Sequence, residues 1–182
     1  MRTPLLPLLL TSTLLLHGCA TTPAPPTALS RLLESVNQRL DIAEAVALNK
    51  WDSGQPVAAP EREQQVIANA QAQAVRFGVD GQRAARFFAD QIEANKLLQY
   101  SALSRWHAVG SAPDTQRIDL GKQLRPQLDR LQRTLLSQLA EFDRNRPVQC
   151  QATLARSIDQ LDKNPQQSLA LIRATTHLCS PL

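Results

Sequence analysis

From residue 28 onward, apolar residues recur at alternating spacings of three and four, which is the period of one face of an α-helix. Only 6 glycines occur among 182 residues, too few for the many tight turns of a large twisted sheet. The first such stripe consists of Leu29, Leu33, Val36, Leu40, Ala43 and Ala47. The pattern predicts an all-α fold, a single-domain bundle of about six helices over residues 28–182.

Turn-forming residues divide this pattern into segments. The expected helices cover residues 28–53, 60–77, 81–106, 125–143, 148–162 and 165–178. Gly54 and Gly78 are placed to end the first two helices, and Asp80 is a favourable N-cap for the third. Pro126 leaves two alternatives for the fourth helix, which begins either close to Arg125 or near Asp119 with a bend at the proline.

The first 20 residues have the character of a signal peptide. Arg2 precedes an apolar run over residues 5–16 that is too short to span a bilayer. The run ends in Leu16-His17-Gly18-Cys19, which resembles a bacterial lipobox with Cys19 as the lipidated residue. The small residues around Cys19 equally suit cleavage without lipidation. Both alternatives predict export, to the periplasm or the medium, with residues 21–27 as a proline-rich tether.

The cysteine count agrees with export. Of three cysteines, Cys19 is removed or lipidated, which leaves Cys150 and Cys179 to form a disulfide near the C-terminus in an oxidising compartment. The alternative is a pair of buried free thiols. No cysteine or histidine spacing predicts a metal site. The net charge of +4 is spread along the chain without a basic run, which argues against nucleic-acid binding.

Several polar residues interrupt the apolar stripes. Arg39 and Lys50 lie eleven residues apart, about three turns of the expected helix 28–53, so we expect their side chains to lie above one another. A single cation of this kind is most simply explained by snorkelling to the surface. Four cations, Arg39, Lys50, Arg62 and Arg125, recur without acids on the same faces, and buried unpaired cations are costly. We therefore expect a compact ligand with more than one negative charge, held between the helices.

The order and spacing of these residues resemble the all-helical chorismate mutases. The signal peptide and the C-terminal cysteine pair are similar to the secreted, or gamma, class, and the resemblance extends over residues 29–179. The segments that carry it are Arg39-Leu40-Asp41-Ile42-Ala43, Ala47-Leu48-Asn49-Lys50-Trp51, Glu61-Arg62-Glu63-Gln64-Gln65, residues 87–100 and Leu124-Arg125-Pro126-Gln127-Leu128-Asp129.

The resemblance implies an enzyme that rearranges chorismate to prephenate without metal, cofactor or covalent intermediate. It assigns Arg39, Lys50 and Gln99 to catalysis, with Lys50 and Gln99 at the ether oxygen of the breaking bond. The substrate-binding residues it implies are Arg62, Glu63, Asn95 and Arg125.

Ala59 departs from the pattern, because relatives usually carry aspartate there, which leaves Glu63 to contact the ring hydroxyl. The class also tends to form homodimers. The alternative function is a non-enzymatic periplasmic helical lipoprotein that binds a small anionic ligand or a partner.

Overall fold

The computed structural model describes residues 25–161 and 164–181, and this part of the chain is helical without strands. The signal peptide, the candidate lipidation site Cys19 and most of the proline-rich tether lie outside it. The elements are α1 (Ala28–Asp41), α2 (Ala43–Ser53), α3 (Pro60–Ala74), the 3₁₀ turn η1 (Val75–Phe77), α4 (Gly81–Val109), the π-helical turn η2 (Leu120–Leu124), α5 (Arg125–Arg144), α6 (Cys150–Asp159) and α7 (Pro165–Ala174). The predicted all-α fold is confirmed.

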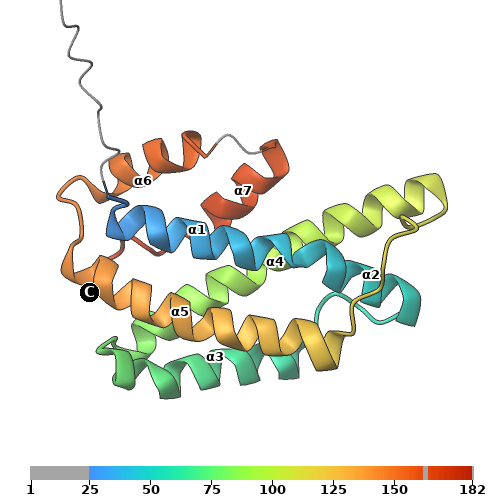
Figure 1. Cartoon of the computed structure of the whole chain (residues 1–182), viewed down its shortest axis with the longest axis horizontal. Coiled ribbons are helices and arrows are strands. Elements are labelled where there is room, and N and C mark those ends of the chain that lie inside the picture. Colours follow the sequence, from blue (N-terminus) through green and yellow to red (C-terminus); the bar gives the residue numbers. More distant parts are fainter. Residues whose placement is uncertain (1–24, 162–163, 182) are drawn as a thin grey trace, which may run out of the picture.

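Helix α4, with 29 residues, is the longest element and contacts α1, α2, α3 and α7 (Figure 1). Helix α5 packs against α1 and lies beside α3. The main core forms where these helices meet, and its fully buried large side chains include Leu32, Leu33, Phe87, Phe88, Leu135, Leu136, Leu139 and Leu171. The apolar stripes of the sequence therefore meet mainly in this core, and two smaller clusters lie beside α2.

The predicted helix boundaries are largely confirmed. The Asp80 carboxylate accepts a hydrogen bond of 2.8 Å from the backbone N–H of Arg83, which caps α4. Gly54 and Gly78 follow their helices in the left-handed conformation, with φ of 67° and 72°, which a residue with a Cβ rarely adopts.

The expected first helix is interrupted at Ile42, which separates α1 from α2. Helix α1 packs on α5 and α7, whereas α2 packs Ala47 and Leu48 against Ala102 and Trp106 of α4. The two segments thus differ in their main tertiary partners, which the spacing of apolar residues within one segment does not encode.

Each alternative for the fourth helix is correct in part: the α-helix α5 begins at Arg125, and a π-helical turn that starts directly after Asp119 precedes it. The N–H groups of Leu124 and Arg125 bond to carbonyls five residues earlier, those of Asp119 and Leu120. The chain changes from π-helical to α-helical geometry at Arg125, directly before Pro126.

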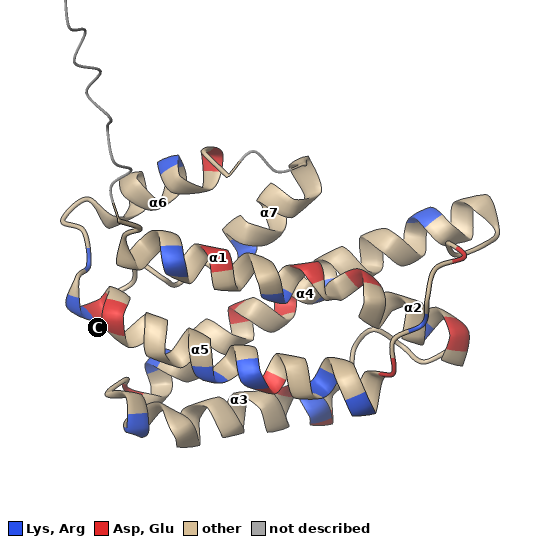
Figure 2. Ribbon diagram, in the orientation of Figure 1, with Lys and Arg blue, Asp and Glu red and all other residues tan. Residues whose placement is uncertain are grey.

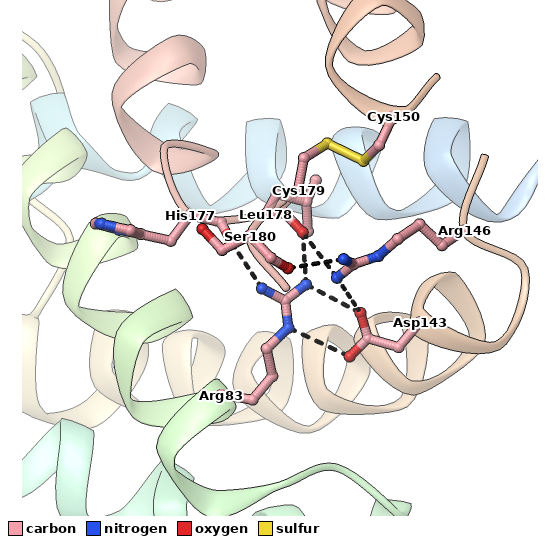
Figure 3. Close-up of a disulfide and its surroundings, with 8 residues drawn as sticks. All are labelled: Arg83, Asp143, Arg146, Cys150, His177, Leu178, Cys179 and Ser180. Atoms are coloured by element: carbon pink, nitrogen blue, oxygen red, sulfur yellow. Dashed lines mark hydrogen bonds and ion pairs between the residues drawn. A yellow bond between two sulfur atoms is a disulfide. The ribbon is translucent and has the colours of Figure 1, made fainter. Parts of the chain in front are cut away.

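The predicted disulfide between Cys150 and Cys179 is confirmed, with a Cα–Cα distance of 5.7 Å. Polar contacts that the sequence did not predict hold the same C-terminal turn (Figure 3). The buried guanidinium of Arg83 donates to the Asp143 carboxylate at 2.9 Å and to the carbonyls of His177 and Leu178 at 2.7 and 2.6 Å. A buried ion pair and the disulfide therefore fasten the end of the chain to α4, α5 and α6.

Candidate active site

A cavity of about 230 Å³ lies between α1, α2, α3, α4 and α5. All seven residues that the sequence predicted as the site line it: Arg39 of α1, Lys50 of α2, Arg62 and Glu63 of α3, Asn95 and Gln99 of α4, and Arg125 of α5. Apolar wall is supplied by Val46, Val57, Val66, Ile92, Leu120 and Leu128. The fold thus brings together residues up to 86 positions apart in the sequence.

Arg39 lies in the last turn of α1 and is only 6% exposed. Its Nε has no hydrogen-bond partner among the described residues. Burial lowers the pKa of the guanidinium to about 10; the charge of Asp129 opposes this shift and that of Arg62 adds to it. Arg39 is therefore a charged donor at neutral pH whose hydrogen-bonding capacity the protein leaves partly unused.

The other three cations are less buried than the sequence suggested. Lys50 and Arg62 are half-buried and Arg125 is exposed at the cavity edge, so the expectation of four buried, unpaired cations is correct only for Arg39. Arg62 also has partners, since it donates to Gln65 Oε1 at 2.6 Å and lies 3.9 Å from the Asp129 carboxylate. Arg125 is exposed because it occupies the first position of α5, beside the apolar stripe rather than on it.

The pKa of Lys50 is lowered by its surroundings. Burial is the largest cause of the lowered pKa of its ammonium group, and the charge of Arg125 lowers the pKa further, while Glu63 opposes the shift. Lys50 thus loses its proton more readily than an exposed lysine.

Asn95 and Gln99 form a hydrogen-bonded relay on α4. Asn95 Nδ2 donates to the backbone carbonyl of Arg39 at 3.2 Å, and Gln99 Nε2 donates to Asn95 Oδ1 at 2.7 Å. The carbonyl of Arg39 can only accept a hydrogen bond, so the amide nitrogen of Asn95 must face it. The amide oxygen of Asn95 then faces the amide nitrogen of Gln99. Gln99 is buried and its Oε1 has no partner in the described structure.

The sequence did not single out four further polar residues that line the cavity, namely Gln55, Lys96, Asp129 and Gln132. Lys96 resembles a surface residue in the sequence, because Glu93 three positions earlier forms an ordinary helical ion pair with it. With these residues the cavity is lined by five cations and two carboxylates. The excess of cations makes it suitable for an anion with more than one charge.

Charged residues elsewhere are distributed differently. Figure 2 shows Lys and Arg interspersed with Asp and Glu along the helices instead of concentrated on one of them. Over the described ranges, no group of three or more His, Cys, Asp or Glu side chains is arranged to hold a metal ion. None of the described helices combines the length and the apolar character needed to cross a membrane.

A model of the family "Chorismate mutase type II" matches residues 30–100. The secreted chorismate mutase of Mycolicibacterium smegmatis is 32% identical over 132 residues, which cover 70% of this chain and 71% of that protein. The chain belongs to the chorismate mutase family. The matched range 30–100 includes six of the seven predicted site residues, all except Arg125.

Crystal structures of chorismate mutases support the same assignment. The enzyme from Burkholderia phymatum has a TM-score of 0.81 and 38% sequence identity, covering 85% of this chain and 97% of that one. The enzyme from Burkholderia thailandensis has a TM-score of 0.79 and 37% identity, covering 85% of this chain and 100% of that one. Family, fold and composition of the cavity therefore agree.

Proposed function

We propose that the protein converts chorismate to prephenate in this cavity. In this rearrangement a carbon–oxygen bond of the substrate breaks while a carbon–carbon bond forms, and no atom enters or leaves. The observation that carries the proposal is the convergence of the seven predicted residues from five helices on one cavity. Their types match the task, since chorismate has two carboxylates, a ring hydroxyl and an ether oxygen.

The cations would hold the substrate in the conformation that reacts. Arg39 and Arg125 are assigned to the two carboxylates, and Arg62 supplies further positive charge beside Arg39. Guanidinium groups suit this role because they donate two parallel hydrogen bonds to a carboxylate. Fixing both ends of a flexible substrate removes part of the entropic barrier to reaction.

Lys50 and Gln99 would stabilise the transition state. Negative charge develops on the ether oxygen as its bond to carbon breaks, so donors fixed at that oxygen lower the barrier. Gln99 Nε2 carries two hydrogens, of which one bonds to Asn95, and this leaves the second for the substrate. An acceleration of about a millionfold requires roughly 8 kcal/mol, which fixed donors in a desolvated cavity can supply.

The test is to mix purified protein with chorismate and follow the loss of its absorbance, with the product identified by NMR. Conversion to prephenate well above the uncatalysed rate is the expected result. Saturable binding of chorismate without turnover at micromolar protein would favour the alternative, a non-enzymatic binding protein.

We further propose that the protein is exported and that Cys19 is lipidated. The curated relative in Mycolicibacterium smegmatis is named a secreted enzyme, which supports export. Incorporation of a labelled fatty acid that Cys19→Ser abolishes is expected. An unlabelled protein that begins after residue 20 would indicate cleavage without an anchor.

We also propose a homodimer, by analogy with the secreted class. Sedimentation analysis of the purified protein should give twice the mass of the mature chain, and a monomer at all concentrations would refute this.

A further inference from the structure

Glu63 is held at both of its carboxylate oxygens. The backbone N–H of Ala59 donates to Oε1 at 2.9 Å, and Lys96 Nζ donates to Oε2 at 3.3 Å. Ala59 occupies the N-cap of α3 and has no side chain that could cap the helix. One carboxylate oxygen of Glu63 therefore accepts a backbone hydrogen bond at the start of α3, and the other contacts Lys96 of α4.

Lys96 differs from the other cations of the cavity because two carboxylates already neutralise it. Its Nζ lies 2.8 Å from Glu93 as well as 3.3 Å from Glu63, and its side chain is only 18% exposed. The contacts with Glu93 and Glu63 raise the pKa of Lys96, so it stays charged throughout the neutral range. A cation paired in this way is poorly available to bind a carboxylate of the ligand.

Glu63 also acts on Lys50 across the cavity, where its charge raises the pKa of that ammonium group. An attraction of this kind draws Glu63 towards the cation assigned to the substrate. Two donors oppose this attraction: the backbone N–H of Ala59 at Oε1 and the ammonium group of Lys96 at Oε2, and Lys96 is the only side chain among the described residues that donates to Glu63.

We propose that Lys96 is a positioning residue that aims Glu63 at the ring hydroxyl of the substrate and keeps it away from Lys50. The inference rests on the proposed function, because it assigns the hydroxyl of chorismate to Glu63. Lys96 then determines specificity for the hydroxyl and contributes to KM through Lys50, while it touches no reacting atom.

The experiment compares chorismate with an analogue that has hydrogen in place of the ring hydroxyl. The wild type should prefer chorismate in kcat/KM by roughly tenfold or more, as expected for a hydrogen bond to a charged group. Lys96→Met should bring this preference close to one and raise KM for both substrates, since both use Lys50, with the larger loss of kcat/KM for chorismate. Lys96→Arg should restore most of the preference.

Two further variants separate positioning from a merely structural role. Glu93→Gln, the matched control, removes the outer partner of Lys96 and should retain the preference. Glu63→Gln should lose the preference as Lys96→Met does, and the double variant should lose no more than either.

A Lys96→Met protein that keeps the wild-type preference would overturn this inference and leave the proposed function intact. A wild-type protein that does not convert chorismate would overturn both. Equal melting temperatures of Lys96→Met and Glu93→Gln would show that folding does not explain the difference.

Discussion

Replacement of Arg39 by methionine should separate catalysis from stability. Burial lowers the pKa of Arg39 from the ordinary arginine value to about 10, which corresponds to about 3 kcal/mol by which folding disfavours its charged form. Methionine retains the aliphatic part of the side chain and removes the charge. The free energy of unfolding without ligand should therefore stay the same or rise, by at most about 3 kcal/mol.

Activity should change in the opposite direction. Loss of the carboxylate contact should reduce kcat/KM at least about a hundredfold, or about 2.7 kcal/mol. The assays are chorismate turnover and urea denaturation of the ligand-free protein. The matched control is Arg86→Met, which removes an exposed arginine of α4 and should change neither quantity. If Arg39→Met loses as much stability as activity, the arginine is structural. Unchanged activity would show that it does not bind the substrate.

Three further predictions concern pH and the disulfide. Lys50 is assigned to the substrate in its protonated form, and its pKa is lowered, so kcat/KM should stay level through neutral pH and fall at an alkaline pH below the ordinary lysine pKa of 10.5. Lys50→Arg should shift this loss of activity to higher pH. If the loss occurs at the same pH in the variant, another group causes it. Gln99→Glu should have low kcat/KM at neutral pH, where its carboxylate repels the charge that develops on the ether oxygen, and kcat/KM should recover as pH falls. If the variant follows the wild-type pH profile over roughly pH 5–8, Gln99 does not contact the ether oxygen. Replacement of Cys150 and Cys179 by serine should lower the free energy of unfolding, measured by denaturation, by about 3.5 kcal/mol. Turnover should not change, because neither cysteine lines the cavity, and a large loss of turnover would contradict this prediction.

Features with a local sequence signal were predictable from the sequence. The cap at Asp80 and the stop at Gly54 depend on neighbouring backbone groups, and the structure contains both. The interruption at Ile42 was not predictable, because no proline or glycine marks it; the structure adds only that α1 packs mainly on α5 and α2 mainly on α4. The π-helical turn before Arg125 was not predicted; the sequence indicated only that Pro126 would either mark the start of the helix or bend it.

Seven polar residues of the cavity were predictable because each stands out from an apolar stripe or matches a family motif. The internal contacts of the cavity were not. Lys96 contacts Glu63 from 33 positions away, and no local pattern distinguishes this contact from the helical pair with Glu93. Arg83 was missed for the same reason, since its partners Asp143 and the carbonyl of Leu178 are 60 and 95 positions away.

A crystal structure with a bicyclic dicarboxylate analogue of the transition state would test the proposed site most directly. The account predicts that the two carboxylates bind Arg39 and Arg125, and that the ether oxygen lies within hydrogen-bond distance of Lys50 Nζ and Gln99 Nε2. An analogue bound outside the cavity, or one whose ether oxygen faces Glu63 or Asp129, would contradict it.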